Sequence, residues 1–247
     1  MSDFTEENSE QKVIAGRNAV AAALSSDEEL DAIYITKGTP KRLVDMAKER
    51  GLAVKNATQD KLDRLCGGVA HQGVAVTGSC AKYASLEDIL EASRKKGTKP
   101  LIIICDEIED PHNLGAIIRT AEAVGADGVI IPKRRSASLS TTVFKTSAGA
   151  ASLLPVARVS NITAAINVLK ENNIWIYGTD MNGSDYCSAD LRGAVALVIG
   201  SEGRGLGRLV SESCDCLLSL PMNGETSSLN ASVAAGVFMY EVLRQRR

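Results

Sequence analysis

The stretch Leu220–Gly236, which reads LPMNGETSSLNASVAAG, decides how this chain of 247 residues folds. The apolar run Leu217–Leu220 predicts a strand that ends at Pro221. A polar loop follows, and Ser228 and Asn230 are residue types that cap the start of a helix. A polar loop at the carboxyl end of a buried strand is where open α/β sheets bind ligands. The stretch therefore predicts a strand, a binding loop and a helix whose small residues pack closely.

The composition predicts a globular protein with an aliphatic core. Apolar residues make up 45% of the chain, but aromatic residues make up only 4%. The core must therefore consist of Val, Ile, Leu and Ala, which suits helices packed closely on a sheet. The formal net charge is -2 and the pI is about 5.8. A mildly acidic body argues against bulk electrostatic binding to nucleic acid or membranes, and it leaves a local basic patch open.

Cysteine and histidine usage argues against a metal site. The six cysteines form no C-x-x-C pair and the chain has two histidines, whereas zinc sites need clusters of these residues. Scattered thiols fit a reducing cytoplasm, and no apolar stretch approaches the roughly 20 residues that span a bilayer. Residues 1–11 are acidic and polar, and we expect a disordered tail there. The cysteines are Cys66, Cys80, Cys105, Cys187, Cys214 and Cys216.

The order of apolar and polar segments predicts two domains. Residues 12–80 alternate short strand and helix patterns and predict a small α/β domain. Residues 81–98 are expected to form a linker and the first helix of the next domain, which covers residues 99–247. In the N-terminal domain we expect helices over 19–24, 41–50 and 59–65, and strands over 32–35, 52–54 and 73–77.

Beyond residue 99 the alternation of strands and helices is regular. Runs such as LIIIC (101–105) and VALVIG (195–200) are apolar almost throughout, as in parallel strands whose two faces are both covered by helices. We therefore expect a parallel α/β sheet, with the single tryptophan, Trp175, in its core. The expected strands are 101–105, 128–131, 174–177, 194–199 and 216–220, and the expected helices are 86–95, 114–124, 162–171, 206–212 and 229–244.

A second informative segment is Asp106–Arg119, which reads DEIEDPHNLGAIIR. A strand ends in an acidic loop, Pro111 sets the turn, and a helix begins near Asn113. Arg119 lies six residues after Asn113, so the two side chains are not stacked on one helix face, but both can line one cleft if the loop curls over the helix start. The simpler interpretation makes Asn113 a helix cap and Arg119 a surface charge, and both interpretations stay open.

A third segment, Ile199–Leu206, reads IGSEGRGL and follows a buried strand. Its glycines let the backbone approach a ligand closely, although a plain tight turn explains them equally well. The segment is neither a dinucleotide-binding fingerprint nor a P-loop. Glu202 adds a carboxylate, which favours a neutral or cationic ligand over a phosphate.

Together and in this order, the three segments resemble the SpoU-type RNA 2′-O-ribose methyltransferases of the SPOUT superfamily. The N-terminal domain is also similar to the substrate-binding domain of the subgroup that modifies a guanosine of large-subunit rRNA, so the resemblance covers nearly the whole chain. The matching stretches are DPHNLGAIIRTAEAVGADGVI (110–130), KTSAGA (145–150), LVIGSEGRGL (197–206), LPMNGETSSLNASVAAGVFMYEVLRQR (220–246), IAGRNAV (14–20) and HQGV (71–74).

The resemblance implies a fold and a cofactor that periodicity alone does not indicate. The fold is a parallel α/β sheet with a deep C-terminal trefoil knot, an exception to the usual threading of chains, beside a small N-terminal α/β domain. The cofactor is S-adenosyl-L-methionine, held by the loops at 199–205 and 220–224. The residues that the resemblance assigns to cofactor binding are Thr179, Gly200, Leu220, Met222, Ser228 and Leu229.

The resemblance also assigns the chemistry to four side chains, Asn113, Arg119, Glu202 and Asn230. The counterpart of Arg119 is held to activate the ribose 2′-hydroxyl. Because a guanidinium stays charged in proteins, we interpret Arg119 as a clamp for substrate phosphate that also stabilises the developing alkoxide. Asn113 would orient Arg119 or the ribose, and Glu202 and Asn230 would complete the polar wall. The structural alternatives are a solvated turn for Glu202 and helix capping for Asn230.

Local basic residues are the expected RNA contacts. Lys133, Arg134 and Arg135 follow the strand at 128–131, and Lys145 comes shortly after them. Phosphate neutralisation there would make RNA binding depend on salt, whereas the alternative is a solubilising loop. Arg17 in the N-terminal domain would widen the contact surface.

The sequence as a whole therefore predicts a cytoplasmic RNA 2′-O-methyltransferase. We expect its substrate to be a guanosine of large-subunit rRNA, because tRNA enzymes of the family usually lack the N-terminal domain. We also expect a homodimer, because family members pair through the knotted domain and build the site near that interface. The alternatives are a tRNA 2′-O-methyltransferase and a non-catalytic RNA-binding module of ribosome assembly. A nucleotide-dependent dehydrogenase is disfavoured because its fingerprint is absent.

Overall fold

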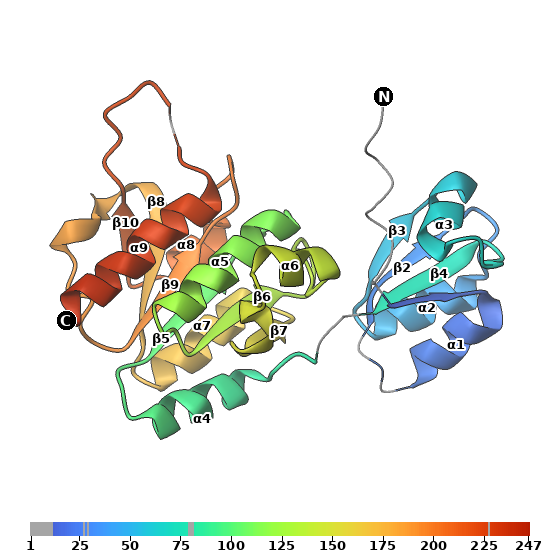
Figure 1. Ribbon diagram of the computed structural model, residues 1–247, viewed down its shortest axis with the longest axis horizontal. Helices are drawn as coiled ribbons and strands as arrows, with labels where there is room; N and C mark the ends of the chain where they lie inside the picture. Colours follow the sequence, from blue (N-terminus) through green and yellow to red (C-terminus); the bar gives the residue numbers. More distant parts are fainter. Residues whose placement is uncertain (1–11, 27, 29, 79–81, 227) are drawn as a thin grey trace. The chain divides into compact units, whose positions relative to one another are not determined.

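The structure, a computed structural model, divides into two compact units (Figure 1). The first extends to Lys82 and includes Ser138–Thr141, and the second comprises Tyr83–Ala137 and Thr142–Arg247. It describes residues 12–26, 28, 30–78, 82–226 and 228–247. The expected tail at 1–11 and Cys80 lie outside the described residues. The helix predicted at 86–95 belongs to the C-terminal unit.

The N-terminal unit is a four-stranded mixed sheet with helices on both faces. Its strand order is β1-β4-β2-β3, with β4 antiparallel to β1 and β2, and with β2 parallel to β3. Val20 and Leu43 from two helices pack with Ile33 and Val76 of the sheet, and Leu62 packs in a smaller cluster. The elements are β1 (Lys12–Ala15), α1 (Arg17–Ser25), β2 (Leu30–Ile35), α2 (Lys41–Glu49), β3 (Ala53–Asn56), α3 (Gln59–Cys66) and β4 (Val74–Gly78).

The C-terminal unit is built on six parallel strands in the order β10-β8-β9-β5-β6-β7. The expected parallel sheet is confirmed, and β7 and α6 are additions that apolar patterning did not indicate. The strands are β5 (Leu101–Cys105), β6 (Gly128–Pro132), β7 (Val156–Val159), β8 (Trp175–Asp185), β9 (Val195–Ile199) and β10 (Cys216–Ser219). The helices are α4 (Leu86–Lys96), α5 (Pro111–Ala123), α6 (Thr141–Thr146), α7 (Ile162–Glu171), α8 (Arg208–Glu212) and α9 (Ala231–Gln245), with short 3₁₀ turns η1 (Ala150–Ser152) and η2 (Tyr186–Ser188).

The sheet is buried between two layers of helices. On one face Ile102 and Ile104 pack with Ile89 of α4 and Leu169 of α7. Because side chains alternate along a strand, Ile103 points to the other face, where α5 and α9 pack side by side (Figure 1). Both faces are therefore apolar, as the runs LIIIC and VALVIG predicted. No helix within the described residues is long and apolar enough to cross a membrane.

The C-terminal helix α9 is enclosed by a segment that precedes it in the chain. It packs on β9 and also contacts η2 in the β8–β9 connection. The ring of Tyr186 meets that of Phe238 edge to face at 6.1 Å. The Gln245 side chain donates to the Ala189 carbonyl at 3.0 Å and accepts from the Leu191 N–H at 2.8 Å. The last helix thus packs against the β8–β9 connection and is hydrogen-bonded to it.

Strand β8 is longer and less regular than predicted. Its pairing with β10 jumps from Gly178 to Ser184 opposite the consecutive residues Leu217 and Leu218, so residues 179–183 leave the ladder. A Cβ atom at Gly183 would lie 2.6 Å from the backbone of Leu217, so only glycine fits this close approach. The excursion carries residues 179–182 to the carboxyl edge of the sheet.

The prediction that Trp175 lies in the core is wrong. The residue is 59% exposed, although Ile174 and Ile176 on either side of it are buried. Trp175 is the first residue of β8 and pairs with Val195, the first residue of β9. Its side chain points to the opposite face from its neighbours, at the amino end of the strand, where the covering layer ends. Apolar character alone did not distinguish the end of the strand from its centre.

Candidate functional site

A cavity of about 600 Å³ opens at the carboxyl ends of β8, β9 and β10. Its walls come from the excursion of β8, from the turn after β9, and from the segment between β10 and α9. Such an edge of a parallel sheet is where ligands bind in open α/β folds. The six residues predicted to bind a cofactor all line this cavity, and they are Thr179, Gly200, Leu220, Met222, Ser228 and Leu229.

The turn after β9 is held in shape by short-range hydrogen bonds. Ser201 and Gly205 exchange backbone hydrogen bonds of 3.1 and 2.9 Å. The Thr179 hydroxyl donates to the Val198 carbonyl at 3.2 Å and accepts from the Gly200 N–H at 3.5 Å. A Cβ atom at Gly200 would lie 2.6 Å from the Leu206 nitrogen. The glycine is therefore required for the turn to fold back on itself, and the turn in turn forms one wall of the cavity.

The cavity combines apolar walls with carboxylate oxygens. Leu218, Leu220 and Phe238 give it apolar surface, and Asp180 and Glu202 give it acidic groups. Leu220 and Leu229 make no hydrogen bond within the described residues, so their backbone N–H and C=O groups are available to a ligand. These walls suit a ligand with a flat apolar ring, hydrogen-bonding edges and a positive charge.

Beside the cavity, three of the four predicted catalytic side chains meet in one network. The Glu202 Oε1 atom accepts from the Asn113 amide at 3.0 Å, from the Asn230 amide at 2.5 Å and from the Ala231 N–H at 3.2 Å. The Asn230 amide also donates to Asn113 Oδ1 at 2.9 Å. The second oxygen of Glu202 has no hydrogen-bond partner within the described residues. One carboxylate oxygen therefore joins α5, the turn after β9 and α9.

Helix capping explains Asn230 in part and does not explain Asn113. Asn230 is the N-cap of α9, and its Oδ1 accepts from the N–H groups of Ser232 and Val233. The N-cap of α5 is Asp110, whose side chain accepts from the His112 N–H at 2.9 Å. Asn113 lies inside the helix and is 8% exposed. The Asn113 amide therefore caps no helix, and it is hydrogen-bonded to Glu202 and Asn230 instead.

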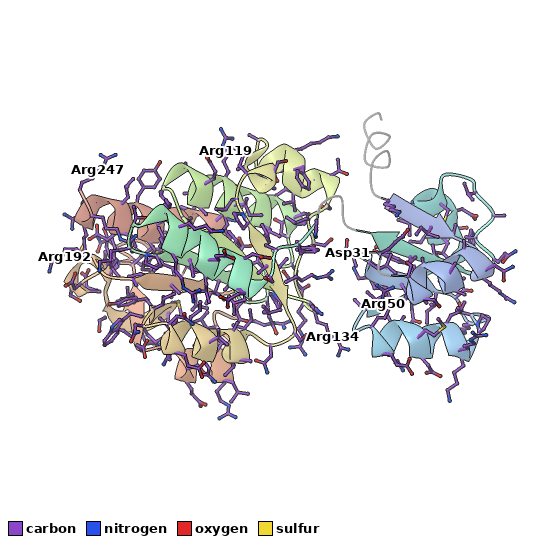
Figure 2. The ribbon with its side chains drawn as sticks, turned by 90° about the horizontal axis from the view of Figure 1, so that it is seen from below. Asp31, Arg50, Arg119, Arg134, Arg192 and Arg247 are labelled. Carbon is purple, nitrogen blue, oxygen red and sulfur yellow. The ribbon has the colours of Figure 1, made fainter. Side chains whose placement is uncertain are left out.

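Arg119 is separate from this network in a single chain. It is exposed on α5, and Figure 2 shows its side chain pointing away from the molecule. It does not line the cavity, and it makes no hydrogen bond or ion pair within the described residues. The structure therefore brings together Asn113, Glu202 and Asn230, and leaves Arg119 on the surface.

The basic residues after β6 lie at the same edge of the sheet. Arg134 and Arg135 are exposed, as is Lys145 on α6. The Arg135 guanidinium donates to Glu107 at 2.7 Å, and this carboxylate raises the pKa of Arg135. Arg204, which sequence reasoning missed, lies 3.9 Å from the same carboxylate and lines the cavity. The sequence Gly-Arg-Gly at residues 203–205 is the signal from which Arg204 could have been predicted.

Burial changes the pKa values of two side chains at the end of β5, Asp106 and Cys105. Burial raises the pKa of Asp106, while a hydrogen bond from the Gly207 N–H lowers it. That bond is 2.8 Å long and ties the exit of β5 to the start of α8. Burial also raises the pKa of Cys105 to about 12. Cys105 is thus a protonated, inert thiol near neutral pH, in keeping with a core role.

The N-terminal unit has a groove of its own, with a volume of about 930 Å³. Arg17 lies on it and is held by hydrogen bonds of 3.3 Å to the carbonyls of Gln72 and Gly38. His71 is buried beneath it, accepts at Nδ1 from the Gly73 N–H, and has Nε2 at 3.0 Å from Asp63. The arrangement holds Arg17 in place at a concave surface.

The fold and the site define a class of α/β proteins with a threaded C-terminal helix and a cavity formed by its loops. The chain belongs to the SpoU rRNA methylase family, whose model matches residues 100–240. A second model, for RNA 2′-O ribose methyltransferase substrate binding, matches residues 13–84. The family of RNA methyltransferases and the knotted fold expected from the sequence are therefore confirmed.

Relatives and solved structures agree with this assignment. The chain is 47% identical to the Bacillus subtilis protein YacO, over 94% of this chain and 95% of that protein. It is 44% identical to a Staphylococcus aureus protein, over 96% of this chain and 97% of that protein. Both relatives are named for the TrmH family of tRNA/rRNA methyltransferases. The SpoU methyltransferase AviRb from Streptomyces viridochromogenes, solved with AdoMet, has a TM-score of 0.62 at 26% identity, over 96% of this chain and 90% of that chain. The TrmH/SpoU tRNA modifying enzyme from A. aeolicus has a TM-score of 0.56 at 28% identity, over 65% and 84%.

Proposed function

We propose that this RNA methyltransferase transfers a methyl group from S-adenosylmethionine to the 2′-hydroxyl of a guanosine in large-subunit rRNA. The observation that carries the proposal is the position of the Asn113–Glu202–Asn230 network beside the cavity at the carboxyl edge of the sheet. The cavity is suited to the methyl donor, and the network beside it is suited to the methyl acceptor.

The cavity fits S-adenosylmethionine by its chemistry. Leu220, Leu229 and Met222 offer apolar surface to an adenine ring, and the free backbone groups of Leu220 and Leu229 offer hydrogen bonds to its edge. A sulfonium is cationic, and the oxygens of Asp180 and Glu202 supply negative charge in the cavity wall. AviRb, which shares the fold, binds AdoMet. When bound, the cofactor supplies an electrophilic methyl group.

The chain's own residues then position and stabilise the nucleophile. A ribose hydroxyl is a weak nucleophile and must lose its proton in or near the transition state. Glu202 and Asn230 hold the amide of Asn113 in one orientation, so the network presents fixed polar atoms to the ribose. Arg119 keeps its charge, binds a substrate phosphate and stabilises the developing alkoxide. In-line positioning supplies much of the remaining rate acceleration.

Recognition of the RNA uses both units. The exposed side chains of Arg134, Arg135 and Lys145, with Lys133 beside them, neutralise phosphates near the cavity. Arg17 adds a contact in the groove of the N-terminal unit. A folded RNA presents its 2′-hydroxyl on a splayed nucleotide, so shape rather than sequence dominates this recognition.

The N-terminal unit favours rRNA over tRNA as the substrate. The A. aeolicus tRNA modifying enzyme matches only 65% of this chain. The second unit, residues 13–84, matches a substrate-binding model. A compact extra unit for binding fits a large, folded substrate better than it fits a small one.

We also propose that two copies pair through α9. Val233, Val237 and Tyr240 are 53%, 37% and 53% exposed and recur at positions i, i+4 and i+7 of the helix. Such an apolar stripe on the surface marks an interaction site. Arg119 lies outside the cavity of its own chain, on the helix that packs against α9. Pairing through α9 brings Arg119 to the neighbourhood of the interface, where a shared site forms.

The proposal is tested by mapping 2′-O-methyl groups in rRNA and tRNA from cells with and without the gene. We expect one guanosine of large-subunit rRNA to lose its 2′-O-methyl group in the deletion strain and to regain it on complementation. Loss of a tRNA modification instead would assign the chain to tRNA. Unchanged RNA in both pools would favour a non-catalytic RNA-binding role.

A further inference from the structure

A carboxylate sits between two arginines at the mouth of the cavity. Glu107 follows β5, Arg135 follows β6 and Arg204 lies in the turn after β9. Glu107 Oε1 is 2.7 Å from Arg135, and its Oε2 is 3.9 Å from Arg204. The two arginine side chains are 70% and 81% exposed, whereas that of Glu107 is 25% exposed. The carboxylate is thus tucked between two solvated guanidinium groups.

The backbone at this ion pair is strained at both partners. Glu107 has φ of 56° and Arg135 has φ of 54°, in the left-handed region that favours glycine. Strain of this kind persists where the surroundings impose it and is concentrated at functional sites. An exposed ion pair contributes little stability, so stability alone does not account for two strained residues that hold each other.

The loops that carry these residues are fixed to one another. β5 lies between β9 and β6 in the sheet. On one side of Glu107 the Asp106 N–H donates to the Ile199 carbonyl at 2.8 Å, and on the other side the Ala137 N–H donates to the Ile108 carbonyl at 2.8 Å. Arg135 and Arg204 are therefore presented on a rigid edge, with Arg204 two residues from Glu202.

We propose that Arg135 and Arg204 form a fork for a phosphate of the RNA substrate next to the nucleotide that is methylated, and that Glu107 occupies the fork until RNA binds. This inference rests on the proposed function, in which RNA is the substrate. Paired guanidinium groups match phosphate oxygens as they match carboxylate oxygens. When the phosphate enters, it replaces Glu107, which remains nearby as a repelling charge. Glu107 thus keeps the arginines oriented and lowers their affinity for RNA phosphate.

The first test changes the carboxylate. Glu107→Gln keeps the size of the side chain and removes the competing charge, so we expect affinity for unmodified, transcribed large-subunit rRNA to rise roughly fivefold. The matched control is Asp190→Asn, which removes one carboxylate from the exposed Asp190–Arg192 pair. Arg192 and Arg134 lie at opposite ends of the C-terminal unit (Figure 2), so this control is expected to leave RNA affinity unchanged.

The second test changes the arginines. Arg135→Ala and Arg204→Ala are each expected to weaken RNA binding. Replacement of both arginines is expected to reduce the slope of log affinity against log salt by about 0.7 to 0.9, the value for one phosphate contact. Arg192→Ala is the control of equal charge and is expected to leave the slope unchanged. In a variant in which both fork arginines are replaced, the further change Glu107→Gln is expected to leave the affinity for RNA unchanged.

Three outcomes would contradict the proposal that Arg135 and Arg204 form a fork for a phosphate. They are an unchanged or weaker RNA affinity in Glu107→Gln, a wild-type salt slope when both arginines are replaced, or a change in the cofactor's Kd in place of the RNA affinity. If Glu107→Gln unfolds, Glu107→Gly removes the same carboxylate and adopts the positive φ without strain. Methyl transfer to RNA by the wild-type protein separates the two claims: if transfer occurs and the slopes do not change, the fork fails and the proposed function stands.

Discussion

Glu202 is the residue on which the candidate site depends most. A single oxygen atom of its carboxylate accepts hydrogen bonds from Asn113, from Asn230 and from the backbone at Ala231. The sequence predicted these side chains as separate members of a polar wall. In the structure they form one unit, so the effects of replacing them are expected to be non-additive.

Arg119 is expected to act on the rate of methyl transfer and not on cofactor binding. Arg119→Ala should lower kcat by about 100-fold or more, as does the loss of one donor to a developing oxyanion. The Kd for S-adenosylmethionine should stay unchanged, because Arg119 does not line the cavity. Turnover assays and calorimetric titration measure the two quantities, with Arg192→Ala as the control for charge. Near-normal turnover would remove Arg119 from its role.

Cys105 makes stability depend on pH in the alkaline range. Burial raises its pKa from 9.0 to about 12 in the folded protein. Because the pKa of Cys105 is higher in the folded protein than in the unfolded chain, the stability that the protonated thiol contributes is complete below pH 9. This stability is lost as the pH rises toward 12. The free energy of unfolding is therefore expected to fall in this window, by up to about 1.4 kcal/mol per pH unit for one group.

The alkaline effect is measured by denaturant unfolding at several pH values. Cys105→Ala should make the slope shallower than that of the wild-type protein. An equal slope in wild type and Cys105→Ala would contradict this assignment. Burial also raises the pKa of Cys214, to about 12, and the pKa of Tyr177, so part of the slope should remain in the variant.

The residues that line the cavity were named by the family resemblance and not by residue type alone. Thr179 lies in the excursion of β8, Gly200 follows β9 and Leu229 precedes α9, all at the same edge of the sheet. The strained pair Glu107–Arg135 was missed because a positive φ is imposed by the loops and leaves no mark in residue type. Trp175 was misplaced because exposure at a strand end depends on what covers it.

Among the elements, α9 is the helix at the end of the chain on which the knotted fold depends. Its last turn is fastened by Arg246, whose guanidinium donates to the carbonyls of Leu191, Lys99, Pro100 and Gly193 at distances of 2.6 to 3.4 Å. Burial lowers the pKa of Arg246. Two of these carbonyls begin the sheet at β5, and two lie in the β8–β9 connection. The side chain therefore joins the threaded helix to the segment through which it passes.

Removal of this fastening is expected to destabilise the C-terminal unit. Arg246→Ala leaves the four carbonyls without their donor, and we expect the free energy of unfolding to fall by about 2 kcal/mol. Arg247→Ala is the control, since Arg247 is exposed and has no hydrogen-bond partner within the described residues. Equal denaturant midpoints for the two variants would show that the fastening contributes nothing.

Elements with a strong apolar pattern were predicted closely, and short ones were not. β5 and α7 have the predicted bounds, 101–105 and 162–171. β1 and β7 have four residues each, too few for alternation to stand out from a loop. The threading of α9 was expected from the family resemblance alone, because periodicity carries no information on which segment passes through another.

At the scale of the whole molecule, the stripe on α9 is expected to hold two copies together. Val237→Glu places a charge at the centre of the stripe, so a dimer should become a monomer while the fold is retained. Light scattering after gel filtration measures the mass, and Leu153→Glu, at an apolar residue that is 74% exposed elsewhere, is the control. A wild-type monomer, or a variant that stays dimeric, would remove α9 from the interface.

The activity that we propose for this chain is methylation of a ribose 2′-hydroxyl of large-subunit rRNA. The most direct measurement incubates the purified full-length protein with methyl-labelled S-adenosylmethionine and with unmodified large-subunit rRNA or tRNA, and then locates the label. We expect label on the 2′-oxygen of one guanosine of the rRNA, none in tRNA, and none with Arg119→Ala. Label on a base, label in tRNA alone, or no transfer to either RNA would contradict it.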